Sequence, residues 1–239
     1  MKKMVDIMNT IDLAAFESRV GYRFHRPELL RLAVTHSSYG NEVHHDRMYN
    51  NERLEFLGDA VLELTVSDFL YQEYQNMPEG ELTKLRASIV CEPTLALCAR
   101  ECGLNDVLLL GKGEEATGGR FRDSITSDAF EAVLGAVYMD GGIECARDFV
   151  RKNVLNDIEK KKLFVDSKSI LQEKVQAEGY QSPEYELISE KGPDHCKEFT
   201  VRVIVGGRIL GEGIGRTKKA AEQQAAYSAI TRIQGETCI

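Results

Sequence analysis

The sequence lacks the features that identify membrane proteins and secreted proteins. None of its apolar runs approaches the roughly 18 residues of a transmembrane helix. Asp6 and Asp12 interrupt the first residues, so no apolar core of a secretory signal peptide is present. We therefore expect a cytoplasmic protein with no membrane partner.

Paired metal-binding cysteines are missing as well. The six cysteines are scattered, and Cys98 and Cys102 have no second cysteine or histidine pair at zinc spacing. Reduced thiols in a reducing compartment are the simplest interpretation, and His44 and His45 lie in a polar stretch typical of a solvated loop. No Ser–His–Asp or Cys–His arrangement occurs, and no glycine-rich stretch has the strand and lysine of a phosphate-binding loop. We expect no small-molecule cofactor.

The sequence also lacks an excess of basic residues. The chain carries 30 Lys and Arg against 38 Asp and Glu, a net charge of −8. This balance argues weakly against binding nucleic acid through a generally basic surface. The acidic excess lies entirely before Ser167, because the residues from there onward hold 10 basic and 10 acidic side chains. Local patches must therefore be examined by position.

Helical patterns dominate residues 10–160, and no strand pattern of any length occurs there. Pro27 and Pro93 suit first-turn positions, and Gly103 suits a helix end. The stretch Gly111–Asp123, rich in glycine and charge, predicts a loop. The expected helices are Asp12–Val20, Pro27–His36, Asn51–Glu73, Gly80–Val90, Pro93–Cys102, Ser124–Tyr138 and Ile143–Lys160.

A different pattern follows a predicted linker of residues 161–166. Alternating residues indicate strands, and Gly206-Gly207 predicts a hairpin turn. The expected elements are the helix Ser169–Glu178, the strands Tyr185–Glu190, Phe199–Val205 and Arg208–Gly213, and the helix Lys218–Ile233. The sequence thus predicts an all-α domain over residues 10–160 and a small α+β domain of order α-β-β-β-α over residues 167–236.

The stretch NERLEFLGDAVLEL, residues 51–64, concentrates acids on one predicted helix. Glu52, Glu55 and Asp59 lie within about 60° of one another around the helix axis. Like charges at this spacing cost roughly a few tenths of a kcal/mol per exposed pair. A sequence that accepts this cost has a use for it, and binding of a divalent cation is the leading interpretation.

A second acidic pair, Asp128 and Glu131, shares one face of a later predicted helix whose small residues permit close packing. If this helix packs against residues 51–73, four carboxylates converge into a site for Mg²⁺ or Mn²⁺. Glu79 would join from a loop or helix start. The cations expected to position phosphates are Lys84, Arg86, Arg120 and Arg122. The alternative is that both helices simply carry acids on a solvated face.

The carboxy-terminal domain offers three places for contact with RNA. Gln172 and Gln176 lie one helical turn apart, and such polar groups reach 2′-hydroxyls in the minor groove of A-form RNA. The second place is the loop 191–195 between two strands. Lys218 and Lys219 open the last helix, where lysines and backbone N–H groups together suit a phosphate. A solvated basic helix start is the competing interpretation.

Several long motifs resemble the ribonuclease III family in order and spacing. The motifs are LAVTHSSY (32–39), NERLEFLGDAVLEL (51–64), EGELTKLRASIV (79–90) and GGRFRDSITSDAFEAVLGAVYMDGG (118–142). From Ser167 onward the chain resembles a double-stranded RNA-binding domain that ends in GEGIGRTKKAAEQQAA (211–226). The resemblance covers nearly the whole chain after about residue 10.

This resemblance implies a homodimeric endoribonuclease that cleaves double-stranded RNA with Mg²⁺, or with Mn²⁺ in its place. Its products would carry 5′-phosphates, 3′-hydroxyls and short 3′ overhangs. Ribosomal RNA precursors and other structured transcripts would be its substrates. A non-catalytic RNA-binding protein on a decayed nuclease fold is the alternative, as is a scaffold without turnover. Retention of Glu55, Asp59, Asp128 and Glu131 argues against decay.

The resemblance also implies roles for single residues. The positions that match metal ligands are Glu55, Asp128 and Glu131, and those that match catalytic acids are Asp59 and Glu131. Supporting acidic positions are matched by Glu52 and Glu79, and Phe56 matches an apolar knob inserted into the dimer partner. The residues that fall on RNA-contact segments are Gln172, Gln176, His195, Lys218 and Lys219.

Overall fold

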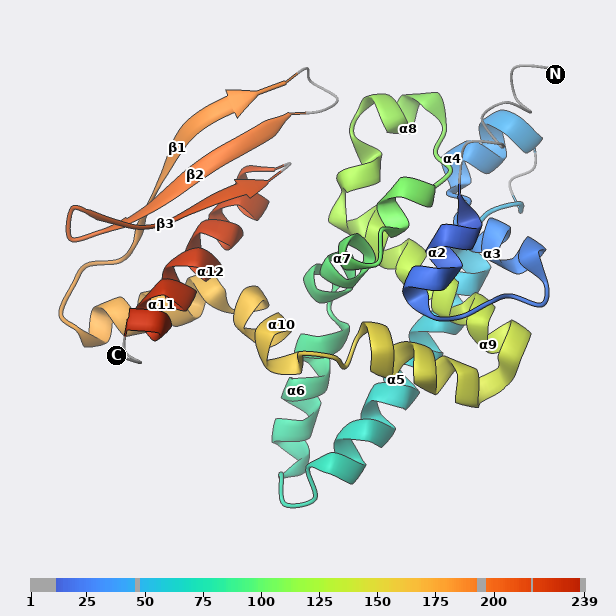
Figure 1. The fold of residues 1–239 in the computed structure, drawn as a ribbon, viewed down its shortest axis with the longest axis horizontal. Coiled ribbons are helices and arrows are strands. Elements are labelled where there is room, and N and C mark those ends of the chain that lie inside the picture. Colours follow the sequence, from blue (N-terminus) through green and yellow to red (C-terminus); the bar gives the residue numbers. More distant parts are fainter. Residues whose placement is uncertain (1–11, 46–47, 193–196, 216, 237–239) are drawn as a thin grey trace. The chain divides into compact units, whose positions relative to one another are not determined.

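A computed structural model describes residues 12–45, 48–192, 197–215 and 217–236 (Figure 1). The chain forms two compact units that divide between Ile158 and Glu159. The first unit is helical, and the second combines helices with one sheet. This arrangement confirms the predicted fold class. Among the predicted contact residues, His195 lies outside the described residues.

The first unit is built from helices over its whole described length. Its longer helices are α2 (Leu13–Val20), α3 (Pro27–Ala33), α5 (Glu52–Glu73), α6 (Glu79–Val90), α7 (Glu92–Glu101) and α9 (Asp123–Asn153). Its short elements are α4 (Ser37–Tyr39), η1 (Gly40–His44), η2 (Leu104–Val107), α8 (Lys112–Ala116) and η3 (Gly119–Phe121). Local signals set several ends: Asp12 caps α2 by accepting from Ala15 N at 2.9 Å, and Pro27 occupies the first turn of α3.

The core of the first unit forms around α5 and α9, which cross at two glycines. A Cβ atom on Gly58 would lie 1.8 Å from the carbonyl oxygen of Glu131, and one on Gly135 would lie 2.2 Å from that of Leu54. The two backbones therefore touch at a point where no side chain fits. The predicted packing of these two helices is confirmed, and it brings residues 51–59 beside residues 128–135.

Two predictions for the first unit need correction. The stretch Gly111–Asp123 is not an irregular loop, because it contains α8 and η3, and its Arg120 and Arg122 pair with acids of the same segment. The two helices predicted from Ser124 onward share the label α9, and a kink at Gly142 (φ 79°, ψ −172°) separates them as the sequence predicted. The last helix of the unit also ends at Asn153 rather than Lys160.

The second unit contains an antiparallel sheet of order β1-β2-β3 covered by helices. Its elements are α10 (Ile158–Val165), α11 (Ser167–Ala177), β1 (Glu184–Lys191), β2 (Glu198–Val205), β3 (Arg208–Gly215) and α12 (Lys218–Glu236). Alternate residues Val201, Val203 and Val205 face the helices and are buried. The hairpin predicted at Gly206-Gly207 is confirmed, because both residues have positive φ (55° and 77°), as a type I′ turn requires.

The segment predicted as a linker, residues 161–166, is mostly helical. Helix α10 runs from Ile158 to Val165, and it packs on α12 rather than standing free. Phe164 stacks edge-on against Tyr227 with ring centroids 5.5 Å apart, and Gln223 donates from Nε2 to the Phe164 carbonyl at 2.5 Å. The composition of the segment did not reveal these contacts because its partners lie about 60 residues later.

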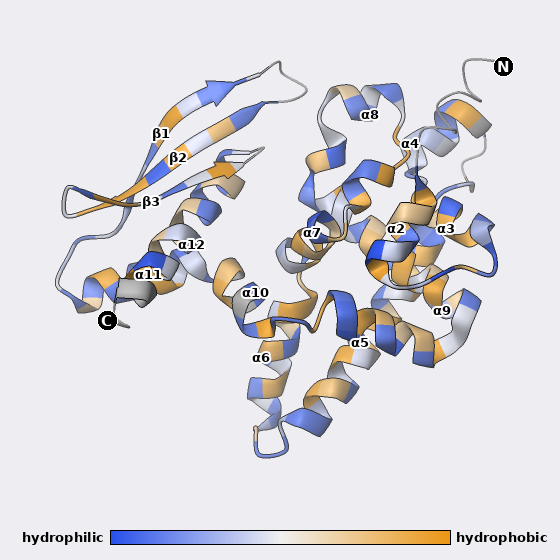
Figure 2. Cartoon of the chain, in the orientation of Figure 1, coloured by the Kyte–Doolittle hydropathy of each residue, from blue (hydrophilic) through white to orange (hydrophobic). Residues whose placement is uncertain are grey.

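Hydrophobic and hydrophilic residues alternate along most helices (Figure 2). Such helices bury one stripe against a core. Within the described parts of the chain, no helix is both long and apolar enough to span a bilayer.

Candidate active site

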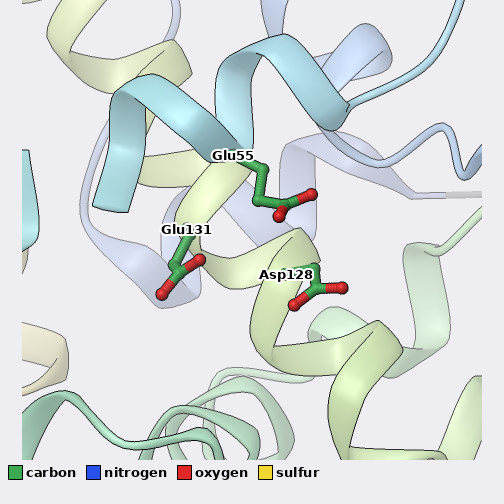
Figure 3. A group of neighbouring side chains, drawn as sticks. All are labelled: Glu55, Asp128 and Glu131. Carbon is green, nitrogen blue, oxygen red and sulfur yellow. The ribbon is translucent and has the colours of Figure 1, made fainter. Parts of the chain in front are cut away.

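Three carboxylates converge at the crossing of α5 and α9 (Figure 3). One oxygen each of Glu55, Asp128 and Glu131 lies within 4.8 Å of the others. Glu55 comes from α5, and the other two lie one turn apart on α9. The Gly58–Gly135 contact fixes the separation of the two helices, so it also fixes the distance between these acids. The structure thus brings together the residues that the motifs matched to metal ligands.

Burial and mutual repulsion disfavour the charged form of all three acids. Burial, followed by the charges of Asp59, Asp128 and Glu55, raises the pKa of Glu131 to about 8. Burial and then the Asp128 charge raise the pKa of Glu55. Burial also raises the pKa of Asp128, although a hydrogen bond from Ser127 opposes the rise. The fold therefore disfavours full ionisation of the three groups, and a bound cation would favour it.

No basic side chain of the described residues forms an ion pair with Glu55, Asp128 or Glu131. Within the described ranges, their only side-chain hydrogen bond runs from Ser127 Oγ to Asp128 at 3.4 Å. Unpaired, partly buried carboxylates with raised pKa values are typical of functional sites. Three oxygens at this spacing fit a hard divalent cation, which prefers carboxylate oxygen and water as ligands. The donor set contains no soft ligand for zinc or copper.

Asp59 and Glu52 lie at the edge of this group rather than inside it. Both are exposed on α5, one turn after and one turn before Glu55. Asp59 is the largest charge contribution to the raised pKa of Glu131, which places it close to that carboxylate. Glu79 begins α6, is exposed, and accepts a hydrogen bond from Thr83 Oγ1 at 2.9 Å. It does not join the three converging acids.

Three of the four cations predicted to position phosphates already have acidic partners. Arg86 pairs with Glu63 at 2.8 Å, and Arg122 pairs with Glu114 at 2.7 Å. Arg120 binds Glu115 through two nitrogens, at 3.0 and 2.6 Å. Lys84 is exposed and has no acidic partner among the described residues. The three arginines therefore hold the fold, and only Lys84 remains available for a phosphate.

A row of large apolar side chains on α5 faces solvent. Phe56 is 81% exposed, Leu64 59% and Tyr71 77%, and they follow one another at helical spacing. Farther along the same helix, a groove of about 390 Å³ separates α5 from α6. The groove is lined by Leu64, Ser67, Asp68, Leu70, Tyr71, Glu79, Leu82, Thr83 and Arg86. Phe56 thus projects from the surface, as the motif comparison predicted for a dimer contact.

Four of the predicted RNA-contact residues of the second unit lie among the described residues, and all four are exposed. Gln172 and Gln176 lie on the solvent side of α11. Lys218 and Lys219 form the first turn of α12, and neither has an acidic partner in the described parts of the chain. Thr217 caps this helix by accepting from Ala220 N at 3.1 Å. The side chains on which the prediction rests are therefore free to reach a ligand.

The sequence argument missed a polar cavity beside the acids. Its walls include Ser37, Asn41, His45, Asn50 and Glu52. The sequence assigned a supporting role to Glu52 and a solvated loop to His45, and it gave no role to Ser37, Asn41 and Asn50, because hydroxyls and amides in a loop carry no spacing signal. The motif LAVTHSSY contains Ser37, but its sequence does not predict a cavity.

Two family models match the chain. One, described as ribonuclease-III-like, matches residues 26–158, and the other, a double-stranded RNA binding motif, matches residues 167–233. A protein named ribonuclease 3 from Anoxybacillus flavithermus is 50% identical and covers 92% of this chain and 93% of its own. One from Pelotomaculum thermopropionicum is 49% identical and covers 95% of both.

A solved structure resembles the first unit. It is the nuclease domain of ribonuclease III from Campylobacter jejuni, studied for flexibility in a region involved in dimer formation. It is 39% identical to this chain, with a TM-score of 0.56, and the match covers 60% of this chain and 96% of that chain.

Proposed function

Since the chain belongs to the ribonuclease III family, we propose that Glu55, Asp128 and Glu131 form the catalytic centre with which it cleaves double-stranded RNA. The single observation that carries this proposal is the convergence of three unpaired carboxylates within 4.8 Å. Residues 10–160 are the endonuclease domain, and residues 167–236 bind the duplex. The enzyme acts in the cytoplasm on ribosomal RNA precursors and other structured transcripts.

The three carboxylates would hold a divalent cation, which we take to be Mg²⁺, with Mn²⁺ as a substitute. Such a cation supplies positive charge that stabilises phosphate oxygens and favours the ionisation of water. The chain contributes the geometry: α5 provides one oxygen ligand, and α9 provides two. Because the fold leaves their repulsion uncompensated, the site gains stability when a cation replaces the proton on Glu131.

Asp59 is the group best placed to act on water at this site. It is exposed, lies one turn from Glu55, and sits close to Glu131. A carboxylate in this position accepts a hydrogen bond and orients water toward the phosphorus, opposite the departing 3′ oxygen. The water oxygen becomes part of the 5′-phosphate, and the 3′ oxygen takes up a proton to become a hydroxyl. Glu52 and Glu79 support the site without contacting the reacting atoms.

The nuclease domain works as a homodimer in this proposal. Phe56 would enter the groove between α5 and α6 of a second copy, and the groove of the first copy would receive the partner's Phe56. Such a twofold contact buries the same surface on both chains. Support comes from an 81% exposed phenylalanine and an apolar-walled groove on one helix. Two acidic sites in one dimer would cut the two strands of a duplex and leave short 3′ overhangs.

The second unit binds the duplex through three segments. Gln172 and Gln176 reach 2′-hydroxyls in one minor groove, and Lys218 and Lys219 contact phosphates across the intervening major groove. His195 belongs to the third segment. Support comes from the exposure of the four described side chains and from the match to the RNA-binding motif. The domain does not need a net positive charge to bind the duplex, because the contacts depend only on the few side chains of these three segments.

The experiment that tests the proposed function uses long duplex RNA with labelled ends. The purified protein is incubated with this duplex with and without Mg²⁺, and the product ends are mapped. We expect magnesium-dependent cuts that leave 5′-phosphates, 3′-hydroxyls and short 3′ overhangs. Tight binding without any magnesium-dependent cut would instead favour a non-catalytic RNA-binding protein on a decayed nuclease fold.

A further inference from the structure

A polar cavity of about 700 Å³ lies directly beside the proposed catalytic centre. Two observations fix this position. Glu52 lines the cavity and lies one turn before Glu55, whose pKa it raises. Ser37 also lines it, two residues after Thr35, whose carbonyl accepts a hydrogen bond from Asn51 N at 2.9 Å at the start of α5. The cavity therefore reaches the acids from the ends of both α5 and α4.

Hydrogen bonds hold the wall of this cavity in place. His36 Nδ1 lies 2.8 Å from Ser38 Oγ, which accepts a hydrogen bond from Gly111 N at 2.9 Å. Asn50 Oδ1 accepts from Glu52 N at 3.1 Å at the start of α5. The segments before α4 and before α5 are thus tied to the core unit, as a preorganised binding site requires.

The chemistry of the lining favours neutral hydroxyl groups. Ser37 and Asn41 present a hydroxyl and an amide that form no side-chain hydrogen bonds with other described residues. The described lining contains no Lys or Arg and does contain the carboxylate of Glu52. This charge disfavours a phosphate. A sugar hydroxyl both donates and accepts, so it can satisfy an amide, a serine and a carboxylate together.

Resting on the proposed function, we propose that this cavity binds the sugar edge of the RNA strand beside the scissile phosphate and recognises one ribose 2′-hydroxyl. The 2′-hydroxyl distinguishes RNA from DNA at a given site. Asn41 and Ser37 are the contacting residues, and the Glu52 carboxylate accepts a hydrogen bond from the hydroxyl. The cavity is thus a sugar-specificity subsite next to the centre that cuts the strand.

A scan of single 2′-deoxy substitutions tests this subsite. Each ribose within one helical turn of a mapped cut is replaced in turn, and single-turnover cleavage in Mg²⁺ is measured for every duplex. We expect one position near the cut at which the wild-type rate falls about tenfold, the effect of one lost hydrogen bond. The same scan is run with Asn41→Ala and Ser37→Ala.

The variants identify the residue that contacts the hydroxyl. With Asn41→Ala or Ser37→Ala, the all-RNA duplex should be cut more slowly, and the deoxy effect at that one position should disappear. Asn76→Ala, at an exposed asparagine in the turn after α5, is the matched control and should keep the wild-type pattern. A deoxy effect that persists in both cavity variants would overturn the subsite, as would equal effects at all positions. Cleavage of the all-RNA duplex by wild type shows in the same experiment that the proposed function stands.

Discussion

At the scale of single residues, the molecule uses carboxylates in two opposite ways. At the catalytic centre, burial and neighbouring acids raise the pKa values of Glu55, Asp128 and Glu131, and no basic side chain of the described residues forms an ion pair with them. Asp140 is buried as well, but it is fully partnered. It accepts from Tyr22 Oη, from His25 N at 2.8 Å, and from Arg26 N at 3.1 Å. The three carboxylates of the catalytic centre remain available to bind a ligand, whereas Asp140 stabilises the fold.

Asp140 provides a prediction about stability and pH. Burial alone would raise its pKa, but hydrogen bonds from His25, Tyr22 and Arg26 outweigh burial and lower the pKa to about 2. A lowered carboxyl pKa contributes stability that is present above the unfolded value of 3.8 and is lost as the pH falls toward 2. Asp140→Asn should reduce the free energy of unfolding by about 2–4 kcal/mol at neutral pH.

Urea unfolding at pH 7 and at pH 3 measures this effect. The difference between wild type and Asp140→Asn should shrink at the lower pH. Asp148→Asn, an exposed acid on the same helix, is the control and should change stability little. Equal stabilities of wild type and Asp140→Asn at pH 7 would contradict the anchoring role.

At the scale of elements, the crossing of α5 and α9 sets the geometry of the site. The sequence predicted both helices and their contact from the spacing of their acids and from the small residues of the later helix. Both features are local signals of period and residue size. It did not predict the two-glycine contact, because nothing local indicates that Gly58 lies against Glu131 and Gly135 against Leu54. It also missed the ion pairs of α8 and η3, whose charge suggested an open loop.

Gly58→Ala tests the crossing. The new Cβ would lie 1.8 Å from the Glu131 carbonyl oxygen, so α5 and α9 must separate. We expect a loss of about 1–3 kcal/mol in stability, as for other overpacked cores, together with reduced cleavage because the acids move apart. Gly80→Ala, a helical glycine with nothing within 4 Å of its added Cβ, is the matched control. The control should gain stability through higher helix propensity, and thermal unfolding of both variants measures the contrast.

At the scale of the whole molecule, the sequence predicted two domains but not the joint between them. Helix α10 occupies the predicted linker and packs on α12 through Phe164 and Tyr227. Asp157, with φ of 53°, precedes it in a left-handed conformation. Neither glycine nor proline marks this position in the sequence. The exposed apolar side chains of α5, which are Phe56, Leu64 and Tyr71, are a separate feature that the proposed dimer would cover.

Phe56→Ala tests the proposed dimer. Removing an apolar anchor at the centre of an interface should weaken self-association at least about thirtyfold. Sedimentation velocity over a range of protein concentrations measures the change. Ile214→Ala removes an exposed apolar side chain from the second unit and should leave the dimer unchanged. If Phe56→Ala sediments as wild type does at every concentration, the knob role is wrong.

The central claim is that Glu131, with Glu55 and Asp128, holds the cation on which cleavage depends. The most direct measurement compares cleavage and duplex binding by wild type, Glu131→Gln and the control Glu73→Gln in Mg²⁺. Glu73 is exposed at the far end of α5. The account predicts that Glu131→Gln binds the duplex as wild type does but cuts it at least about a hundredfold more slowly, while Glu73→Gln does both normally. Cleavage by Glu131→Gln at the wild-type rate would contradict it.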